Sequence, residues 1–310
     1  MNLHDRQVAG ALFLDSLFGE PPVSLHPVVW MGRAISLAER RALAWKSQGG
    51  RLISGSILAF ALPVFVFAVA GAAIRQTPKP LRWLLETVLL SSALSMRGLA
   101  RAATSVEAEL ERGDLEAARA RAGEMVGRDT ETLSEEAVAR AAVESVAENT
   151  SDGVVAPMLY GLLFGAPGAL AYKAINTLDS MVGYREAPYT ELGRASARLD
   201  DLANLIPARL TAVAAAIASG CPAVTFSSAR RYGPLTSSPN AGWPEAAFAG
   251  ALGLQLGGRN FYGDVMREGP ILGDGRRPRP EDIRRAVLLM RRLCVLFAGV
   301  MLVSGIFHRG

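Results

Sequence analysis

One uninterrupted apolar run dominates the hydrophobic pattern of the chain. The 23 residues from Leu52 to Ile74 carry no charge, and Arg51 and Arg75 bound them. A helix of that length spans about 35 Å, more than the ~30 Å hydrocarbon layer of a bilayer. Pro63 falls inside the run, and membrane helices tolerate such a proline. The pattern therefore predicts a transmembrane helix over 52–74.

Other apolar stretches are interrupted by charges. They are 81–96, 154–175, 205–226 and 286–307. A charge at the centre of a membrane helix costs about 2.5–3.5 kcal/mol, so these charges are expected near an interface or in a polar cavity. We predict a second span over 286–307, whose arginines reach one interface. Seven arginines between 276 and 292 place that loop in the cytoplasm by the positive-inside rule.

The rest of the pattern is also helical. Residues 97–148 read as amphipathic helices with a turn at Gly113-Asp114. Residues 227–282 are rich in Gly, Pro and Ser, which predicts loops around one short helix, Pro244–Leu256. Little in the chain alternates as a strand does. We predict an all-α, multi-pass helical membrane protein, a single membrane-embedded domain over 1–310, whose polar loops form a site at the cytoplasmic membrane surface.

Composition supports the membrane interpretation. Hydrophobic residues make up 50% of the chain and charged residues only 20%, below the ~25% of soluble proteins. This composition excludes a disordered chain, and two cysteines in apolar runs exclude a disulfide scaffold. The net charge of +4 comes mainly from arginine. No aromatic interleaving or binding motif accompanies the arginines, so we expect no nucleic-acid partner.

Polar residues interrupt the apolar chain in four clusters, where the chemistry is expected. The first runs from Asp15 to His26, and the segment Gly19-Glu20-Pro21-Pro22 bends it. His26 is the one histidine away from the termini. It is a candidate for proton transfer, although a lone histidine more often has a structural role.

The second cluster is a stripe of charges spaced by four. Arg140, Glu144, Glu148 and Asp152 would share one helix face. One interpretation is a solvated face with ion pairs such as Arg140–Glu144. However, three acids at that spacing repel one another, and the stripe runs into the apolar segment 154–175. We therefore expect the acids to point into a polar cavity and to bind a cation or substrate, with Mg²⁺ favoured by carboxylate oxygens.

The third cluster combines acids with amides. It contains Asn176 and Asp179, then Asp200-Asp201 followed by Asn204. Asp201 and Asn204 are three residues apart, so a helix presents them on one face. An Asp-Asp-x-x-Asn box beside apolar residues can hold Mg²⁺ and, through the ion, phosphate groups. The alternative is that Asp200 only caps the start of a helix.

Groups that could bind phosphate flank and follow this box. Arg198 and Arg209 could clamp phosphate oxygens, because a guanidinium offers a planar fork of donors. The fourth cluster begins at Ser238-Pro239-Asn240, and the helix after Pro244 offers N–H groups to an anion. The chain lacks the Walker phosphate loop, the dinucleotide-binding glycine fingerprint, a zinc cluster and a nucleophile elbow. A nucleotide would therefore bind to none of the common nucleotide-binding motifs.

Together these clusters resemble the CbiB/CobD family of cobalamin biosynthesis, the adenosylcobinamide-phosphate synthases. The short sequence strings that match occur in the same order as in the family, over residues 15–263, and together they are highly specific. The matching strings are residues 26–28, 126–130, 144–149 with 152–153, 176–181, 197–201, 207–209 and 238–242.

The resemblance implies a multi-pass protein of the bacterial inner membrane that acts as an ATP-dependent amide ligase. Its reaction would join a propionate carboxylate of adenosylcobyric acid, the corrinoid substrate, to the amine of aminopropanol phosphate or a related amino-alcohol phosphate. The product would be adenosylcobinamide phosphate. ATP would serve as co-substrate and Mg²⁺ as cofactor. The protein would be embedded in the lipid bilayer. A carboxylate is a poor acyl electrophile, and phosphate transfer from ATP would turn its oxygen into a leaving group.

We assign candidate roles within this reaction. The catalytic candidates are His26, Glu144, Glu148 and Asp201. The substrate- and phosphate-binding candidates are Arg128, Asn149, Lys173, Asn176, Arg198, Arg209, Ser238 and Asn240. The metal-binding candidates are Asp152, Asp179, Asp200 and Asn204. The residues leave open whether His26 or an acid takes the proton from the attacking amine.

Two other functions compete with this one. A Mg²⁺-dependent membrane prenyltransferase would use two acidic boxes on facing helices, but the box at 200–204 has no close twin. A non-enzymatic membrane sensor or transport component would tolerate erosion of the polar motifs, and these motifs are intact.

Overall fold

The computed structural model describes residues 3–45, 47–127, 129–184, 186–262 and 265–307. The chain divides into two compact units. Unit 1 contains Met1–Ser95, Ala156–Asn204 and Val300–Gly310. Unit 2 contains Met96–Val155 and Leu205–Gly299. The expectation of an all-α membrane protein is confirmed, apart from one β-hairpin in unit 2.

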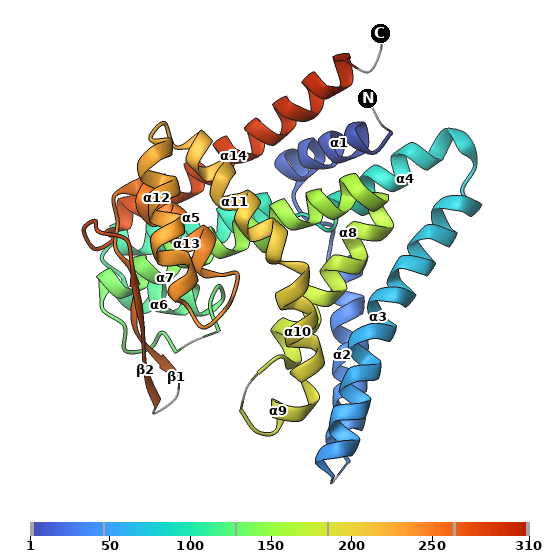
Figure 1. Cartoon of the computed structure of the whole chain (residues 1–310), viewed down its shortest axis with the longest axis horizontal. Coiled ribbons are helices and arrows are strands. Elements are labelled where there is room, and N and C mark those ends of the chain that lie inside the picture. Colours follow the sequence, from blue (N-terminus) through green and yellow to red (C-terminus); the bar gives the residue numbers. More distant parts are fainter. Residues whose placement is uncertain (1–2, 46, 128, 185, 263–264, 308–310) are drawn as a thin grey trace. The chain divides into compact units, whose positions relative to one another are not determined.

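Unit 1 is helical throughout its described part. Helix α3 packs against α8, α9 and α10, and α2 packs against α8 (Figure 1). Ile35 on α2 meets Leu178 and Val182 on α8 in a buried apolar cluster. The helices of this unit are α1 (Leu3–Phe18), α2 (Pro27–Leu43), α3 (Gln48–Gln76), α4 (Lys79–Ser91), α8 (Ala156–Val182), α9 (Tyr189–Leu192) and α10 (Arg194–Ala203).

Helix α3 confirms the predicted transmembrane run. It is 29 residues long, contains Pro63, and has a mean hydropathy of 2.6 over its most apolar window. Only 17% of that window is buried inside the protein, and Phe60 and Val64 remain 59% and 68% exposed. Soluble proteins rarely leave so continuous an apolar face uncovered, so lipid is its natural surroundings.

The apolar stretches that charges interrupt differ in whether they form a helix that could cross a membrane. Within the described residues, a second helical segment is long and apolar enough to cross a membrane, Glu135–Val182, which includes the charge-interrupted stretch 154–175. A third arises only if Arg194–Ala203 and Leu205–Ala218 count as one bent span. Residues 286–307 lie in the helix Pro280–Phe307, which is not among the candidate spans found within the described residues. The stretch 81–96 forms a helix only to Ser91.

Two glycines allow unusually close packing in unit 1. A Cβ added to Gly55 on α3 would overlap the carbonyl oxygen of Leu192 on α9. A Cβ added to Gly193 would overlap the carbonyl oxygen of Val182 at the end of α8. The backbones of α3, α8 and α9 therefore approach one another where no larger residue would fit.

Unit 2 combines helices with one β-hairpin. The turn predicted at Gly113-Asp114 separates α5 from α6, and Asp114 caps α6 by accepting from the Ala117 N–H at 2.9 Å. The elements are α5 (Met96–Glu111), α6 (Leu115–Gly123), α7 (Glu135–Thr150), the π-helix η1 (Ser151–Val155), α11 (Leu205–Ala218), α12 (Pro222–Tyr232), the 3₁₀ turn η2 (Gly233–Leu235), α13 (Gly242–Leu252), and strands β1 (Leu256–Tyr262) and β2 (Val265–Leu272). Helix α14 (Pro280–Phe307) belongs to unit 2 up to Gly299 and to unit 1 from Val300.

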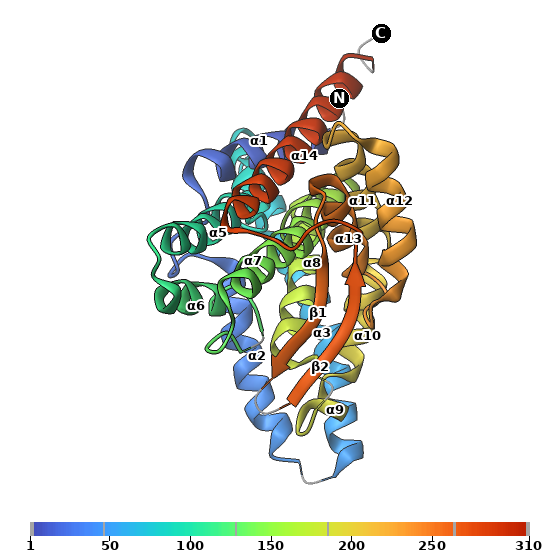
Figure 2. The same ribbon diagram turned by 90° about the vertical axis from the view of Figure 1, so that its left-hand side faces the viewer.

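The hairpin corrects the prediction of loops over 227–282. Strands β1 and β2 pair antiparallel, with Leu256 opposite Leu272 and Tyr262 opposite Val265 (Figure 2). An irregularity between Gly257 and Arg259 shifts the register. The residue pattern does not predict this hairpin, because glycines break the two-residue alternation that identifies a strand.

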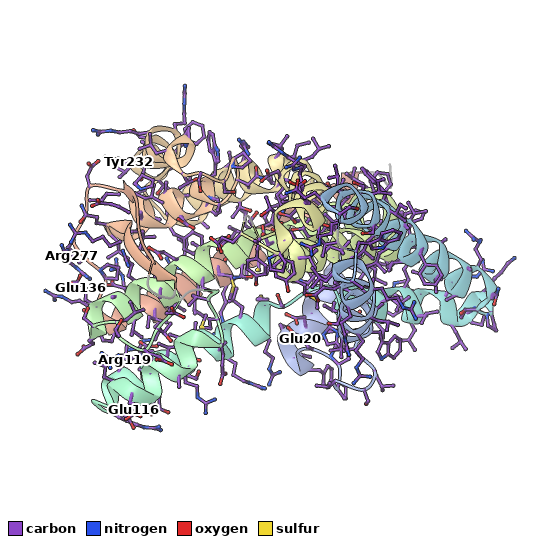
Figure 3. All side chains as sticks on the ribbon, turned by 90° about the horizontal axis from the view of Figure 1, so that it is seen from below. Glu20, Glu116, Arg119, Glu136, Tyr232 and Arg277 are labelled. Carbon is purple, nitrogen blue, oxygen red and sulfur yellow. The ribbon has the colours of Figure 1, made fainter. Side chains whose placement is uncertain are left out.

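Side chains on α6 and α7 hold the segments around them (Figure 3). Arg119 donates to the carbonyl of Leu133 at 2.7 Å, and Thr130 donates to the carbonyl of Arg119 at 2.8 Å. Glu136 near the start of α7 forms an ion pair with Arg277 at 2.9 Å. These contacts tie the segment before α7 to α6, and the start of α7 to the segment before α14.

Candidate functional site

The strongest polar cluster of unit 1 lies on α8 and α10, which pack together. Asp200 on α10 accepts a hydrogen bond from Nδ2 of Asn204 on its Oδ2, at 3.0 Å. Asn176 on α8 also bonds the Asp200 carboxylate, and the charges of Asp179 and Asp201 act on it. The fold thus brings together residues that are about 25 positions apart in the sequence.

The local structure rules out the capping interpretation of Asp200. Helix α10 begins at Arg194 with Gly193 at the cap position, so Asp200 lies well inside the helix. The partner of Asn204 is Asp200, four residues earlier, rather than Asp201 as the spacing suggested. Asp201 is half-buried next to it.

Two stacked tyrosines support this cluster from α8. The rings of Tyr160 and Tyr172 lie 5.1 Å apart and nearly parallel. Tyr172 donates to Oδ1 of Asn204 at 2.8 Å, and Tyr160 donates to the carbonyl of Ala203 at 3.0 Å. The side-chain amide of Asn204 is therefore held at both ends, because its oxygen accepts from Tyr172 and its nitrogen donates to Asp200. Sequence reasoning missed both tyrosines, because they lie in an apolar segment that reads as core.

The remaining cationic candidates of unit 1 lie on the same two helices. Lys173 on α8 donates to Oδ1 of Asn176 at 3.4 Å and is half-buried. Arg198 on α10 is exposed. Lys173 therefore reaches the cluster through Asn176.

This cluster suits a Mg²⁺ ion whose coordination shell also contains phosphate oxygens of the substrates. Among the described residues, no three His, Cys, Asp or Glu side chains are placed to hold a metal together. Mg²⁺ commonly uses only one or two protein carboxylates with phosphates and water. Asp200 meets that requirement, because its Oδ1 is buried and receives no hydrogen bond from the described part of the chain. The donor set therefore suits an open site rather than an all-protein cage.

His26 has a structural position in unit 1. It is 8% exposed and caps α2, where its Nδ1 accepts from the N–H of Val28 at 3.2 Å. Its Nε2 lies 3.4 Å from a carboxylate oxygen of Glu20. Both ring nitrogens are thus occupied, and this favours the structural interpretation of the lone histidine.

The charged stripe of unit 2 does not form one uniform face. Glu144 is buried and accepts from the N–H of Gly257 at 2.7 Å. Arg140 pairs with Glu144 at 3.8 Å and donates to the carbonyls of Gly257 and Arg259. These two residues therefore anchor β1 on α7.

The end of the stripe differs from an ideal α-helix. Glu148 is exposed, contrary to the expectation that it shares a cavity with Glu144. Asn149 donates back to the carbonyl of Ser145 at 2.9 Å. Asp152 lies in η1, a π-helical turn that changes the four-residue register of the stripe. Single π-turns inside α-helices often mark functional sites, so Asp152 stays a candidate.

A second polar cluster of unit 2 surrounds Arg209 on α11. Its guanidinium donates to Oδ1 of the buried Asn240 at 2.7 Å and lies 4.7 Å from the ring centre of Trp243. The hydroxyl of Ser238 accepts from the N–H groups of Asn240 and Ala241, both at 3.2 Å. Ser238 and Asn240 thus shape the loop that orients Arg209. Arg128 lies outside the described residues.

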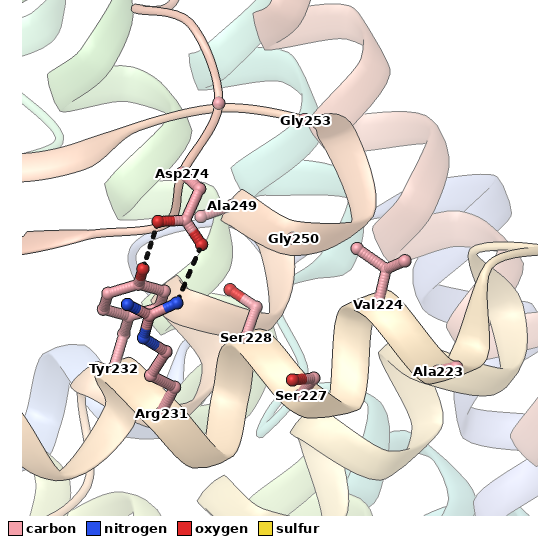
Figure 4. A pocket seen from close by; sticks show the side chains of 11 residues that line it. Ala223, Val224, Ser227, Ser228, Arg231, Tyr232, Ala249, Gly250, Gly253 and Asp274 are labelled. Carbon is pink, nitrogen blue, oxygen red and sulfur yellow. Dashed lines mark hydrogen bonds and ion pairs between the residues drawn. The ribbon is translucent and has the colours of Figure 1, made fainter.

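A separate pocket of unit 2 lies between α12 and α13 (Figure 4). It has a volume of about 540 Å³, and small residues such as Ser227 and Gly250 line much of it. Arg231 and Tyr232 both contact Asp274 at one end.

Comparison with known proteins shows the family. The family model described as CobD/Cbib protein matches residues 8–290. The chain belongs to the CobD/CbiB family. It is 44% identical over 306 residues to the cobalamin biosynthesis protein CobD of Geobacter metallireducens, covering 95% of each chain. It is 42% identical over 283 residues to CobD of Synechocystis sp., covering 87% of this chain and 82% of that one.

A relative that carries the name CbiB is similar to this chain to about the same degree. The cobalamin biosynthesis protein CbiB of Salmonella arizonae is 41% identical over 289 residues, which are 90% of this chain and 91% of that one. No solved structure gives a significant match to the chain. The resemblance read from the sequence motifs is therefore confirmed at the level of the family.

Proposed function

We propose that this CobD/CbiB protein acts in cobalamin biosynthesis as an ATP-dependent amide ligase. The substrates are adenosylcobyric acid, aminopropanol phosphate or a related amino-alcohol phosphate, and ATP, and the product is adenosylcobinamide phosphate. The observation that carries the proposal is the acid–amide cluster of α8 and α10, where Asp200 presents a buried oxygen that receives no hydrogen bond from the described residues. Family membership supports the coarser role in cobalamin biosynthesis.

The chemistry matches the residues of this cluster. In the first step a carboxylate oxygen of the corrinoid attacks the γ-phosphorus of ATP, and ADP leaves. Transfer of a phosphoryl group is accelerated mainly by positioned cations. Asp179, Asp200 and Asp201 would hold Mg²⁺ against the phosphates, and Lys173 and Arg198 would contact phosphate oxygens directly.

In the second step the amine attacks the activated acyl carbon, and phosphate leaves with the former carboxylate oxygen. The amine must first lose a proton to a base. The ring nitrogens of His26 are occupied by Val28 and Glu20, so we assign the base to a carboxylate. In unit 2, Arg209 is fixed by Asn240 and Trp243 and offers a guanidinium that suits an anionic group such as a phosphate.

The reaction is proposed to take place at the cytoplasmic face of the inner membrane. Helix α3 supplies an apolar surface long enough to cross the bilayer. The arginines between 276 and 292 favour a cytoplasmic position for the segment that precedes and begins α14. ATP is available on that side.

The test is turnover by the purified full chain in detergent or nanodiscs. We expect amide product only when adenosylcobyric acid, the amino-alcohol phosphate, ATP and Mg²⁺ are all present. Asp200→Asn removes one charge from the proposed ion site, and we expect it to reduce turnover at least a hundredfold while the protein stays folded. Product without ATP, or a fully active Asp200→Asn variant, would overturn the proposal.

A further inference from the structure

We propose that Tyr172 is a positioning residue, which fixes the amide of Asn204 and so determines which oxygen of Asp200 faces the bound cation. The inference rests on the proposed function, since that function supplies the cation. Nothing in the sequence motifs points to Tyr172, because it lies outside the Asp-Asp-x-x-Asn box and inside an apolar segment.

The contact between Tyr172 and Asn204 is enclosed. Each residue is 1% exposed, and the phenol hydroxyl donates to Oδ1 of Asn204 at 2.8 Å. A buried polar atom that loses its partner is costly, since water cannot replace it. The hydroxyl therefore holds one particular orientation of the amide.

That orientation is the one that Asp200 requires. Asn204 donates from Nδ2 to Oδ2 of Asp200 at 3.0 Å. Rotation of the amide by a half-turn would place its oxygen against the carboxylate, which accepts hydrogen bonds and donates none when ionised. Tyr172 and Asp200 thus satisfy the two ends of one amide.

The consequence appears on the opposite oxygen of Asp200. With Oδ2 engaged by Asn204, Oδ1 stays buried without a hydrogen bond from the described part of the chain. A fixed carboxylate with one open oxygen is prepared to bind a cation. Groups that orient metal ligands in this way commonly change metal affinity by about 10- to 100-fold when they are removed.

Tyr160 provides a matched control on the same helix. It stacks on Tyr172, but its hydroxyl donates to the backbone carbonyl of Ala203 instead of Asn204. Tyr160→Phe and Tyr172→Phe each remove one hydroxyl from the same aromatic pair. Only Tyr172→Phe breaks the connection to Asp200.

The experiment measures Mn²⁺ binding by electron paramagnetic resonance. The full chain in detergent is titrated with Mn²⁺, alone and with a non-hydrolysable ATP analogue. We expect Tyr172→Phe to weaken Mn²⁺ binding about tenfold and Tyr160→Phe to change it less than twofold. Asn204→Asp keeps the acceptor for Tyr172 but loses the donor to Asp200, so it should also weaken binding despite its added negative charge.

The outcomes separate the possibilities. Equal Mn²⁺ binding by the two phenylalanine variants would overturn the inference, as would tighter binding by Asn204→Asp or no binding by the wild-type chain in either titration. If Tyr172→Phe does not elute as a folded species, Asn204→Asp against Tyr160→Phe decides the question. Mn²⁺ binding that follows these expectations without amide formation by the wild type would overturn the proposed function alone.

Discussion

Glu144 and Glu148 look equivalent in the sequence, yet the structure separates them. Glu144 is buried, paired with Arg140 and bonded to the N–H of Gly257, whereas Glu148 is exposed on the same helix. Four-residue spacing predicted a shared face, but it could not show that β1 covers only one end of that face. The contact depends on a hairpin more than 100 residues further along the chain.

This difference gives a pair of variants with opposite expectations. Glu144→Ala leaves the N–H of Gly257 and the guanidinium of Arg140 without their carboxylate, so we expect a loss of about 1–3 kcal/mol in the free energy of unfolding. Glu148→Ala should stay within about 0.5 kcal/mol of the wild type. Thermal melts of the two purified variants measure this, and equal melting temperatures would contradict the assigned role of Glu144.

A catalytic role for Glu148 predicts a separate effect on activity. Glu148→Gln keeps the size of the side chain and removes its charge. We expect turnover to fall severely while the melting temperature stays unchanged or rises, because a like charge leaves the stripe. Normal turnover of Glu148→Gln, with and without added Mg²⁺, would show instead that Glu148 belongs to a solvated face.

At the scale of elements, apolar length was the most reliable signal. The run 52–74 predicted α3 correctly, since so long an uncharged stretch fits only a few structures. The β-hairpin was missed, because glycines in β1 interrupt the alternation and α7 supplies part of its hydrogen bonding. The π-turn η1 was also missed, since no residue pattern distinguishes it from α-helix.

Close packing of α3 against α9 depends on Gly55. A larger residue there would collide with the backbone of Leu192, so we expect Gly55→Ala to lower the free energy of unfolding by about 1–3 kcal/mol. Gly49 lies on the same helix with no atom within 4 Å of an added Cβ, which makes Gly49→Ala the control. Melting in detergent should shift for Gly55→Ala only, and an equal shift for both would contradict the packing described.

The start of α14 depends on a buried carboxylate. Burial raises the pKa of Asp282, but hydrogen bonds from Arg276, the N–H of Arg279 and Arg285 outweigh it and lower the pKa below its usual range. The folded pKa is therefore below the unfolded value of about 3.9. The resulting stability is present at neutral pH and is lost as the pH falls through the folded pKa.

We expect Asp282→Asn to be less stable than the wild type at pH 7. The difference should shrink as the pH falls below about 4, because the unfolded carboxyl is protonated first and the folded carboxyl only at lower pH. Chemical unfolding at pH 7 and at acidic pH measures this difference. A gap between the two proteins that widens on acidification would contradict the lowered pKa.

At the scale of the whole molecule, family and membrane association could be predicted from the sequence, and the division into two units could not. Local patterns report helices and motifs, whereas the units arise from contacts between segments far apart in the chain. The candidate site, too, could be predicted only in part from local sequence patterns. The motifs identified the acids and amides, but the choice of Asp200 over Asp201 as the partner of Asn204 depends on how α10 folds.

The apolar surface of α3 predicts where the protein is found. We expect the full chain to sediment with membranes, to resist extraction by salt or alkaline carbonate, and to require detergent for solubilisation. Cell fractionation followed by immunoblotting measures this. Monodisperse protein recovered without detergent would contradict a bilayer-spanning α3.

The central claim is that ATP activates a corrinoid carboxylate for attack by an amine. The most direct measurement supplies the purified chain with adenosylcobyric acid labelled with ¹⁸O in the reacting carboxylate, together with ATP, Mg²⁺ and aminopropanol phosphate. Because the leaving phosphate takes one oxygen from the carboxylate, the account predicts one ¹⁸O atom in the released inorganic phosphate for each amide formed. Absence of the amide, or amide formation with unlabelled phosphate, would contradict it.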